Sequence, residues 1–188
     1  GIDPIGLARA MATNLLAGIV ESDTVFDVYA RDRSSGQTQR LLAAFGIQPI
    51  QDIYLLDITP DGRFVLISSC DSHLVANDSN NQCDVFVVDR VTTTIELANV
   101  DSNEVQADFE WPYPFGAQIT DDGRFVAFTS GASNLSPDNS PGLQVFIRDR
   151  ATGSTRMAMQ AVSGALDGGT YLIDMANEGH YAVLWNTA

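Results

Sequence analysis

Apolar and polar residues alternate in short runs along this chain, and the same runs return at regular intervals. The segment "ITPDGRFVLISS" (58–69) returns sixty-one residues later as "ITDDGRFVAFTS" (119–130), with eight of twelve positions identical. The segment 84–98 returns as 144–158, and an earlier copy occupies 27–41. A period near 60 residues, made of strand-like runs, is typical of an array of all-β units. The pattern therefore predicts an all-β fold built from repeated sheets.

Each repeat is predicted to hold four short strands, which the middle copy shows best. A partly alternating run (53–59) leads into an Asp-Gly pair, which supplies the positive φ of a tight turn. The next run (63–68) is continuously apolar, which indicates burial on both faces. A polar loop, a third strand (84–89) and a Thr-rich turn follow, and a more polar strand ends the unit.

Four-stranded antiparallel sheets repeated in series are typical of β-propeller blades. The "T-P-D-G-R-F-V-L-I-S-S" core, the "S-N-L" loop (133–135) and the "D-V-F-V-V-D-R" hairpin resemble the TolB-type, WD-repeat-like β-propeller repeat of bacteria. This resemblance covers nearly the whole chain and implies a single propeller domain or propeller fragment. It implies little about function, because such blades serve many proteins. The expected repeat units span about 1–45, 46–105 and 106–165, with a partial unit at 166–188.

The phase of the repeats predicts about three blades in this chain. Residues 13–15 occupy the loop position held by 72–74 and 133–135, and residues 175–186 align with 119–130. Closed propellers have about four to eight blades, so three cannot close a ring. We expect either a homodimer that completes one six-bladed ring or a chain cut from a longer propeller. In the dimer, segment 4–10 would duplicate a partner strand and would have to be displaced or folded differently.

Charge narrows the classes of partner. The net charge is −14, and all ten basic residues are arginine. A nucleic-acid partner is therefore not expected, because phosphate binding needs a basic face. No apolar run reaches the roughly 18–20 residues that span a bilayer, so no membrane span is expected. An acidic surface is compatible with solubility in salt, a cationic partner or divalent cations.

One polar loop has the spacing of a calcium-binding loop. Asp78, Asn80 and Asp84 stand at its positions 1, 3 and 7, and alternating oxygen ligands suit calcium. The glycine and the terminal glutamate of an EF-hand are missing, and turns stabilised by Asp and Asn side chains explain the same residues. Calcium therefore remains one of two interpretations. The corresponding positions of the first unit are Glu21, Asp23 and Asp27.

The two cysteines, Cys70 and Cys83, flank this same loop. They are placed at the end of the second strand and the start of the third, which should be antiparallel neighbours, so a disulfide is geometrically plausible. Neither position is cysteine in the other copies. We expect a disulfide, with free buried thiols as the alternative. A disulfide would favour a periplasmic or extracellular location.

The segment "FEWPYPFG" (109–116) is the least repeated part of the chain. It carries Trp111, Tyr113 and Phe115 between two predicted blades. Exposed aromatic side chains in such a loop can hold a peptide or a small ligand. The alternative is that they pack between the blades. These three residues are the candidate partner-binding residues.

No catalytic constellation is visible in the sequence. Nucleophile-elbow, zinc-protease and phosphate-loop motifs are missing, and the only histidines are His73 and His180. We therefore expect an exported, non-enzymatic binding or assembly module that presents its inter-blade loops to a protein or small ligand. No cofactor is expected unless the polar loop binds calcium. Two alternatives stay open: the propeller part of a larger hydrolase or peptidase, and a calcium- or glycan-binding surface module.

Overall fold

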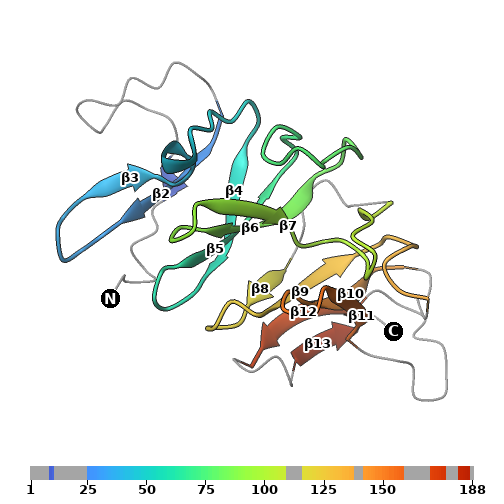
Figure 1. Cartoon of the computed structure of the whole chain (residues 1–188). Helices are drawn as coiled ribbons and strands as arrows, with labels where there is room; N and C mark the ends of the chain where they lie inside the picture. The colour runs from blue at the N-terminus through green and yellow to red at the C-terminus, as the bar shows by residue number, and fades with distance from the viewer. Residues whose placement is uncertain are drawn as a thin grey trace.

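The computed structural model describes residues 9–10, 25–108, 116–137, 142–158, 170–176 and 182–186. Their strands form four antiparallel sheets that follow one another in chain order across the molecule (Figure 1). The described part is all-β apart from a short 3-10 helix at Leu41–Phe45. Within these same ranges, the model contains no helix of the length and apolarity that a membrane crossing needs.

The two middle sheets are four-stranded and have the same strand order. The first has the order β4-β5-β6-β7 and the second β8-β9-β10-β11, with all neighbours antiparallel. This confirms the predicted all-β fold of four-stranded antiparallel repeats. The strands are β4 (Ile53–Ile58), β5 (Phe64–Ser69), β6 (Asp84–Asp89), β7 (Thr94–Leu97), β8 (Ala117–Ile119), β9 (Phe125–Ser130), β10 (Gln144–Asp149) and β11 (Ser154–Met157).

The outer two sheets have fewer strands among the described residues. The first joins β1 (Arg9–Ala10), β2 (Asp27–Arg31) and β3 (Thr38–Arg40). Strand β1 pairs with β2 as β5 pairs with β6, so it occupies the second-strand place that the alignment of segment 4–10 predicted. The last sheet pairs β12 (Thr170–Met175) with β13 (Ala182–Asn186).

Glycine makes the turn between the first two strands of each middle sheet. Gly62 has φ 69° and Gly123 has φ 73°, a left-handed conformation that side chains disfavour. The preceding aspartate keeps a negative φ and acts instead as an acceptor. Asp61 Oδ1 accepts hydrogen bonds from the Thr59 hydroxyl (2.6 Å) and the Arg63 backbone N–H (2.9 Å). The predicted turn is present, with the positive φ at the glycine alone.

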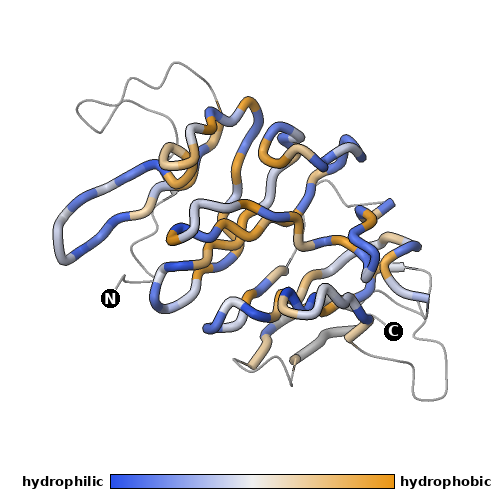
Figure 2. The backbone as a smooth tube through the Cα atoms, viewed as in Figure 1, coloured by the Kyte–Doolittle hydropathy of each residue, from blue (hydrophilic) through white to orange (hydrophobic). Residues whose placement is uncertain are grey.

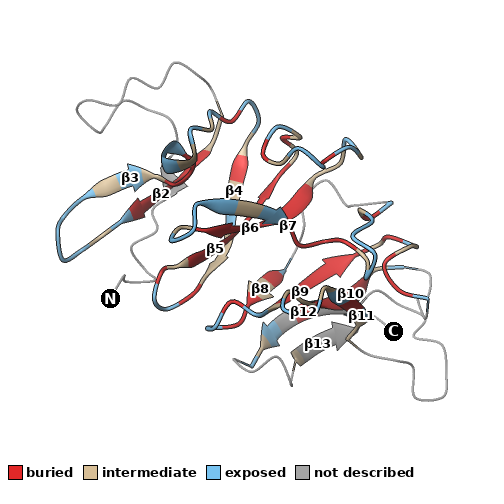
Figure 3. Cartoon of the chain, viewed as in Figure 1, coloured by how far each residue is buried: buried red, intermediate tan, exposed pale blue. Residues whose placement is uncertain are grey.

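The core lies between the sheets, because the central strands are covered on both faces (Figures 2 and 3). All six residues of β5 and all six of β6 are buried, as the continuous apolar run predicted. Alternate side chains of β5 enter different clusters: Phe64 and Leu66 pack toward the third sheet, and Val65 and Ile67 toward the first. Each middle sheet is thus one layer of a stack that is stabilised mainly by burial between neighbouring sheets.

A recurring ion pair locks the second strand's turn to the third strand's end. The Arg63 guanidinium donates to both carboxylate oxygens of Asp89, at 2.8–3.2 Å. Arg124 and Asp149 form the same pair one sheet later. Asp89 also accepts the backbone N–H of Val91 (2.9 Å), as expected for a turn-capping aspartate. The recurrence shows that these charges belong to the architecture of the repeat.

Candidate functional site

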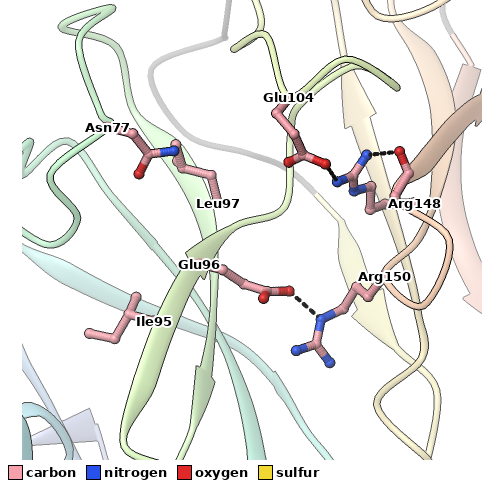
Figure 4. Close-up of a pocket in the computed structure, with 8 residues that line it drawn as sticks. Asn77, Ile95, Glu96, Leu97, Glu104, Arg148 and Arg150 are labelled. Carbon is pink, nitrogen blue, oxygen red and sulfur yellow. Dashed lines mark hydrogen bonds and ion pairs between the residues drawn. The ribbon is translucent and has the colours of Figure 1, made fainter.

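A polar cavity of about 240 Å³ lies where the second and third sheets meet (Figure 4). One wall is the outer strand β7, and the other is the β10–β11 hairpin. Two carboxylates and two guanidinium groups face one another across it. The residues that line it and carry its chemistry are Ile95, Glu96, Glu104, Arg148 and Arg150.

Arg148 anchors the inter-blade loop to the third sheet. It is 5% exposed and directly follows the apolar residues 145–147 of β10. Its Nη1 donates to the backbone carbonyls of Asp101 (3.0 Å) and Gly153 (2.7 Å), and its Nη2 pairs with the Glu104 carboxylate. The equivalent position in the second sheet is Val88, a core residue. The first sheet has Arg31 at this position, where it is exposed, so among these three sheets the burial of the arginine is particular to the third.

Arg150 joins the two sheets at the other side of the cavity. Its Nε donates to Glu96 Oε1 at 2.5 Å, and its Nη1 donates to the Gly123 carbonyl. The guanidinium also lies 4.8 Å from the centroid of the Phe64 ring, within the range of a cation–π contact. Arg90 donates to the Gly62 carbonyl in the same way, so the contact with the turn recurs. The contact of Arg150 with Glu96 is made at the boundary between the second and third sheets.

The loop between the second and third sheets presents an exposed tip beside this cavity. Asp101 Oδ1 accepts the backbone N–H groups of Asn103 and Val105, each at 2.8 Å. Burial opposes the charge of Asp101, but these N–H groups lower the pKa of its carboxyl. Glu104 has φ 63°, and Val105 is 53% exposed. The loop therefore has a fixed base and an accessible tip that combines a carboxylate with an apolar group.

The predicted calcium loop brings its three polar residues together. Asn80 Nδ2 donates to Asp84 Oδ1 at 3.2 Å, and Gln106 Nε2 donates to Asp78 Oδ1 at 3.1 Å. Asp84 also accepts from Asn99 Nδ2 at 2.6 Å. Burial, with a smaller contribution from Asp78, raises the pKa of the Asp84 carboxyl to about 6, although the amide hydrogen bonds oppose the shift. Within the described ranges, no three histidine, cysteine or acidic side chains gather as a metal cluster.

The disulfide residues lie where the sequence placed them. Cys70 follows β5 and Cys83 precedes β6, and the structure joins them in a disulfide across 13 positions of sequence. The loop that they close carries Asp78 and Asn80. Asp84 follows Cys83 directly, so the disulfide fixes the chain beside one carboxylate of the predicted calcium loop.

Several predicted site residues cannot be placed. In the first unit, Asp27 is described and forms an ion pair with Arg40 at 3.4 Å. The predictions for the first-unit calcium loop and for the aromatic segment stay predictions. The predicted residues outside the described ranges are Glu21, Asp23, Trp111, Tyr113 and Phe115.

Sequence reasoning did not single out the cavity between the sheets. Its residues come from the loop after β5, from β7, from the inter-blade loop and from the β10–β11 hairpin, which are far apart in the sequence. One signal was available: this third-strand position is arginine in the first and third copies (Arg31 and Arg148) and valine in the second (Val88). A charged residue at a strand position that becomes buried must find polar partners, so an arginine here indicates polar contacts at the boundary between sheets.

Comparison with solved structures identifies the architecture. The chain is similar to the tricorn protease, with a TM-score of 0.50 and 11% identity over 82% of this chain and 12% of that one. It is similar to a prolyl endopeptidase, with a TM-score of 0.51 and 15% identity over 86% of this chain and 23% of the other. TolB from Acinetobacter baumannii matches with a TM-score of 0.47 and 16% identity, over 89% of this chain and 39% of that chain.

These likenesses show the fold alone, because the identities are low and the chain spans only part of each protein. No family model matches the sequence, and no curated protein matches it either. The four-stranded antiparallel sheets and the two matches at a TM-score of 0.50 or above show a β-propeller module. A TolB protein is among the matching structures, as the repeat motifs predicted.

Proposed function

We propose that this chain is a non-enzymatic propeller module that binds a protein or ligand partner through its inter-blade loops. The observation that carries the proposal is the loop between the second and third sheets. Its base is held by the buried Arg148, while its tip exposes Glu104 and Val105 beside a polar cavity. A fixed base reduces the conformational entropy that a partner must remove on binding.

The chemistry of the cavity suits a polar, extended partner. The side chains of Glu104 and Glu96 are 63% and 52% exposed, so both carboxylates stay accessible while they pair with arginine. Each carboxylate can accept several hydrogen bonds, so the donors of a partner can bind the exposed carboxylate oxygens while the buried Arg148 keeps its ion pair with Glu104. Val105 adds an apolar contact at the rim.

The test compares partner binding by variants at two exposed valines that lie in different loops. Val105 is at the loop tip, and Val91 is in the β6–β7 turn and is 72% exposed. A partner is first isolated from the source cells with the full chain and identified by mass spectrometry, and its Kd is then measured by calorimetry. We expect E104Q/V105S to weaken binding at least about tenfold, and V91S to leave it unchanged. Equal effects of the two changes would overturn the proposed binding surface.

A catalytic alternative rests on the fold. The matches to the tricorn protease and to a prolyl endopeptidase favour a role as the propeller part of a larger hydrolase or peptidase. Cleavage of fluorogenic peptides by the full gene product, measured with and without this propeller segment, tests that alternative. Propeller-dependent turnover would replace the non-enzymatic proposal.

We further propose that the protein is exported to the periplasm or beyond. The support is the disulfide between Cys70 and Cys83, because disulfides persist in oxidising compartments. Thiol labelling of denatured, unreduced protein from the source cells is expected to detect no free thiol. Two reactive thiols per chain would contradict export.

We also propose that the chain forms a homodimer. Among the described strands, β13 pairs only with β12, whereas the middle sheets each have four strands. A two-stranded sheet leaves an edge that β2 and β3 of a second copy can extend, provided that β1 is displaced from β2 in the dimer. Light scattering at micromolar concentration is expected to give twice the chain mass of 20.3 kDa. A monomeric mass would exclude the dimer and leave the binding proposal intact.

A further inference from the structure

Two buried carboxylates in the second sheet's loop each have one oxygen without a hydrogen-bond partner. Asp84 is 0% exposed and Asp78 is 9% exposed. In each case Oδ1 accepts from an amide, while Oδ2 is buried and accepts from no group that the structure describes. An unpaired buried carboxylate is strongly unfavourable unless a cation or a proton compensates it. The loop therefore lacks a positive partner.

At the equivalent positions in the neighbouring sheets, an uncompensated buried charge is avoided in two other ways. Asp84, Asp27 and Gln144 are each the first residue of a third strand. Asp27 is neutralised by Arg40 at 3.4 Å, and Gln144 carries no charge. In the second sheet the acid is kept, and residues 71–89 include no arginine or lysine. Of the described residues that begin these three third strands, Asp84 is the acidic one without an arginine partner.

The groups around the two carboxylates are side-chain amides and a backbone carbonyl. Asn80 Nδ2 donates to Asp84 Oδ1 at 3.2 Å and to the Ala107 carbonyl at 3.4 Å, and Gln106 Nε2 donates to Asp78 Oδ1 at 3.1 Å. The oxygens of the same two amides accept the backbone N–H groups of Gln82 and Ser79. These contacts link the two acids through one short network of amides and carbonyls. A set of carboxylate, amide and backbone oxygens without thiol or imidazole suits a hard cation, and the flexible geometry of such a loop suits calcium better than magnesium.

We propose that Asp78 and Asp84 bind one calcium ion through their Oδ2 atoms. Because the loop offers only two carboxylates, amide or backbone oxygens and water complete the coordination. The disulfide between Cys70 and Cys83 holds the strand ends that carry this loop, so the acids stay close even without the ion. A loop of low charge count is expected to bind with a Kd on the order of 10⁻⁴–10⁻³ M, as extracellular calcium modules do. The site contacts the inter-blade loop through Asn99, Gln106 and Ala107, but calcium binding is measured separately from partner binding.

The experiment measures thermal unfolding of the full chain in EDTA and in 10 mM CaCl₂. Ionic strength is held constant with NaCl, because screening of the net charge of −14 also stabilises the fold. We expect calcium to raise the Tm by about 3–10 °C, from mass action at this affinity and the usual dependence of Tm on stability. Calorimetric titration with CaCl₂ should give one site per chain. An unchanged Tm and no binding heat would overturn the proposal.

Two substitutions separate a calcium ligand from a structural aspartate. D84N and D78N are expected to abolish the calcium-dependent rise in Tm. In EDTA, D84N should be at least as stable as the wild type, because it removes an uncompensated charge and keeps the Oδ1 acceptor. D61N removes the same charge from an exposed turn and should keep the full calcium response. If D84N lowers the Tm equally with and without calcium, Asp84 is only a hydrogen-bond acceptor and the proposal fails.

Discussion

The second and third sheets share one scaffold but differ in the loop before their third strand. Both have the Asp-Gly-Arg turn, the arginine–aspartate pair and a buried second strand. In the second sheet the loop is closed by a disulfide and leads to Asp84, whereas the third sheet has Leu143 in place of Cys83 and Gln144 in place of Asp84. The difference indicates that the residues shared by the two sheets form the blade, and that the residues in which they differ determine the chemistry of each loop.

The two middle sheets also differ at one buried position of their third strands. The second sheet has Val88 in its core, and the third has Arg148 at the equivalent strand position. The arginine gives up apolar packing and gains four polar contacts, of which those to Asp101 and Glu104 hold the inter-blade loop. Each of the two middle sheets therefore holds one loop with residues that the other middle sheet lacks.

The largest effect is expected where the shared scaffold is disturbed. Gly123→Ala should cost about 3–5 kcal/mol, because it combines left-handed strain with overlap of the new Cβ and the Phe64 ring of the preceding sheet. Gly46→Ala is the matched control: its φ is 69°, and no atom lies within 4 Å of the new Cβ. It should cost only about 1–2 kcal/mol, the strain alone. Urea unfolding measures both, and equal costs would show that the close approach to Phe64 contributes nothing.

The disulfide is expected to have the next largest effect, confined to the second sheet's loop. Reduction should destabilise the protein by about 3 kcal/mol, the loop-closure entropy of a loop of this length. C70S/C83S should show the same loss of stability, and its unfolding should not depend on reductant. Urea midpoints with and without reductant test this. A midpoint that reductant does not change would show that the closed loop adds no stability.

Arg148→Val places the second sheet's residue in the third sheet. The change removes the polar contacts of the loop base and should cost about 1–3 kcal/mol, since backbone carbonyls of Asp101 and Gly153 lose their donor. Limited proteolysis should then cleave within residues 99–108 faster than in the wild type. Unchanged cleavage would mean that the loop is held by its own contacts, chiefly those of Asp101.

The smallest effect is expected from the recurring ion pair at acid pH. The hydrogen bond from Arg124 lowers the pKa of Asp149 to about 2, against an ordinary value of 3.8. Because the folded state holds the proton less tightly than the unfolded state, the contribution is present above about pH 4 and is lost as the pH falls toward 2. Arg124→Gln should change the Tm by no more than about 2–4 °C at pH 7. Urea midpoints between pH 5 and 2 should fall less steeply for this variant, and parallel curves would contradict the assigned cause.

The repeat determined the fold class and the strand positions. The third strand at 84–89 was predicted to the residue, and its copy starts at 144 as the repeat requires, because a buried apolar run bounded by polar turns leaves little freedom in register. The Asp-Gly turn with its left-handed glycine also followed from local turn chemistry. Local rules sufficed wherever the interaction partners lie within one hairpin.

Only the tertiary structure decided what meets between the hairpins. The pairing of Arg148 with Glu104, the cavity behind it, and the two unpartnered oxygens of Asp78 and Asp84 depend on how neighbouring sheets and loops stack. The sequence could place Asp84 in an oxygen-rich loop, but it could not show that Asp27 has an arginine partner and Asp84 has none. Burial and counter-charge are properties of the surrounding chain, and residues far apart in the sequence supply them.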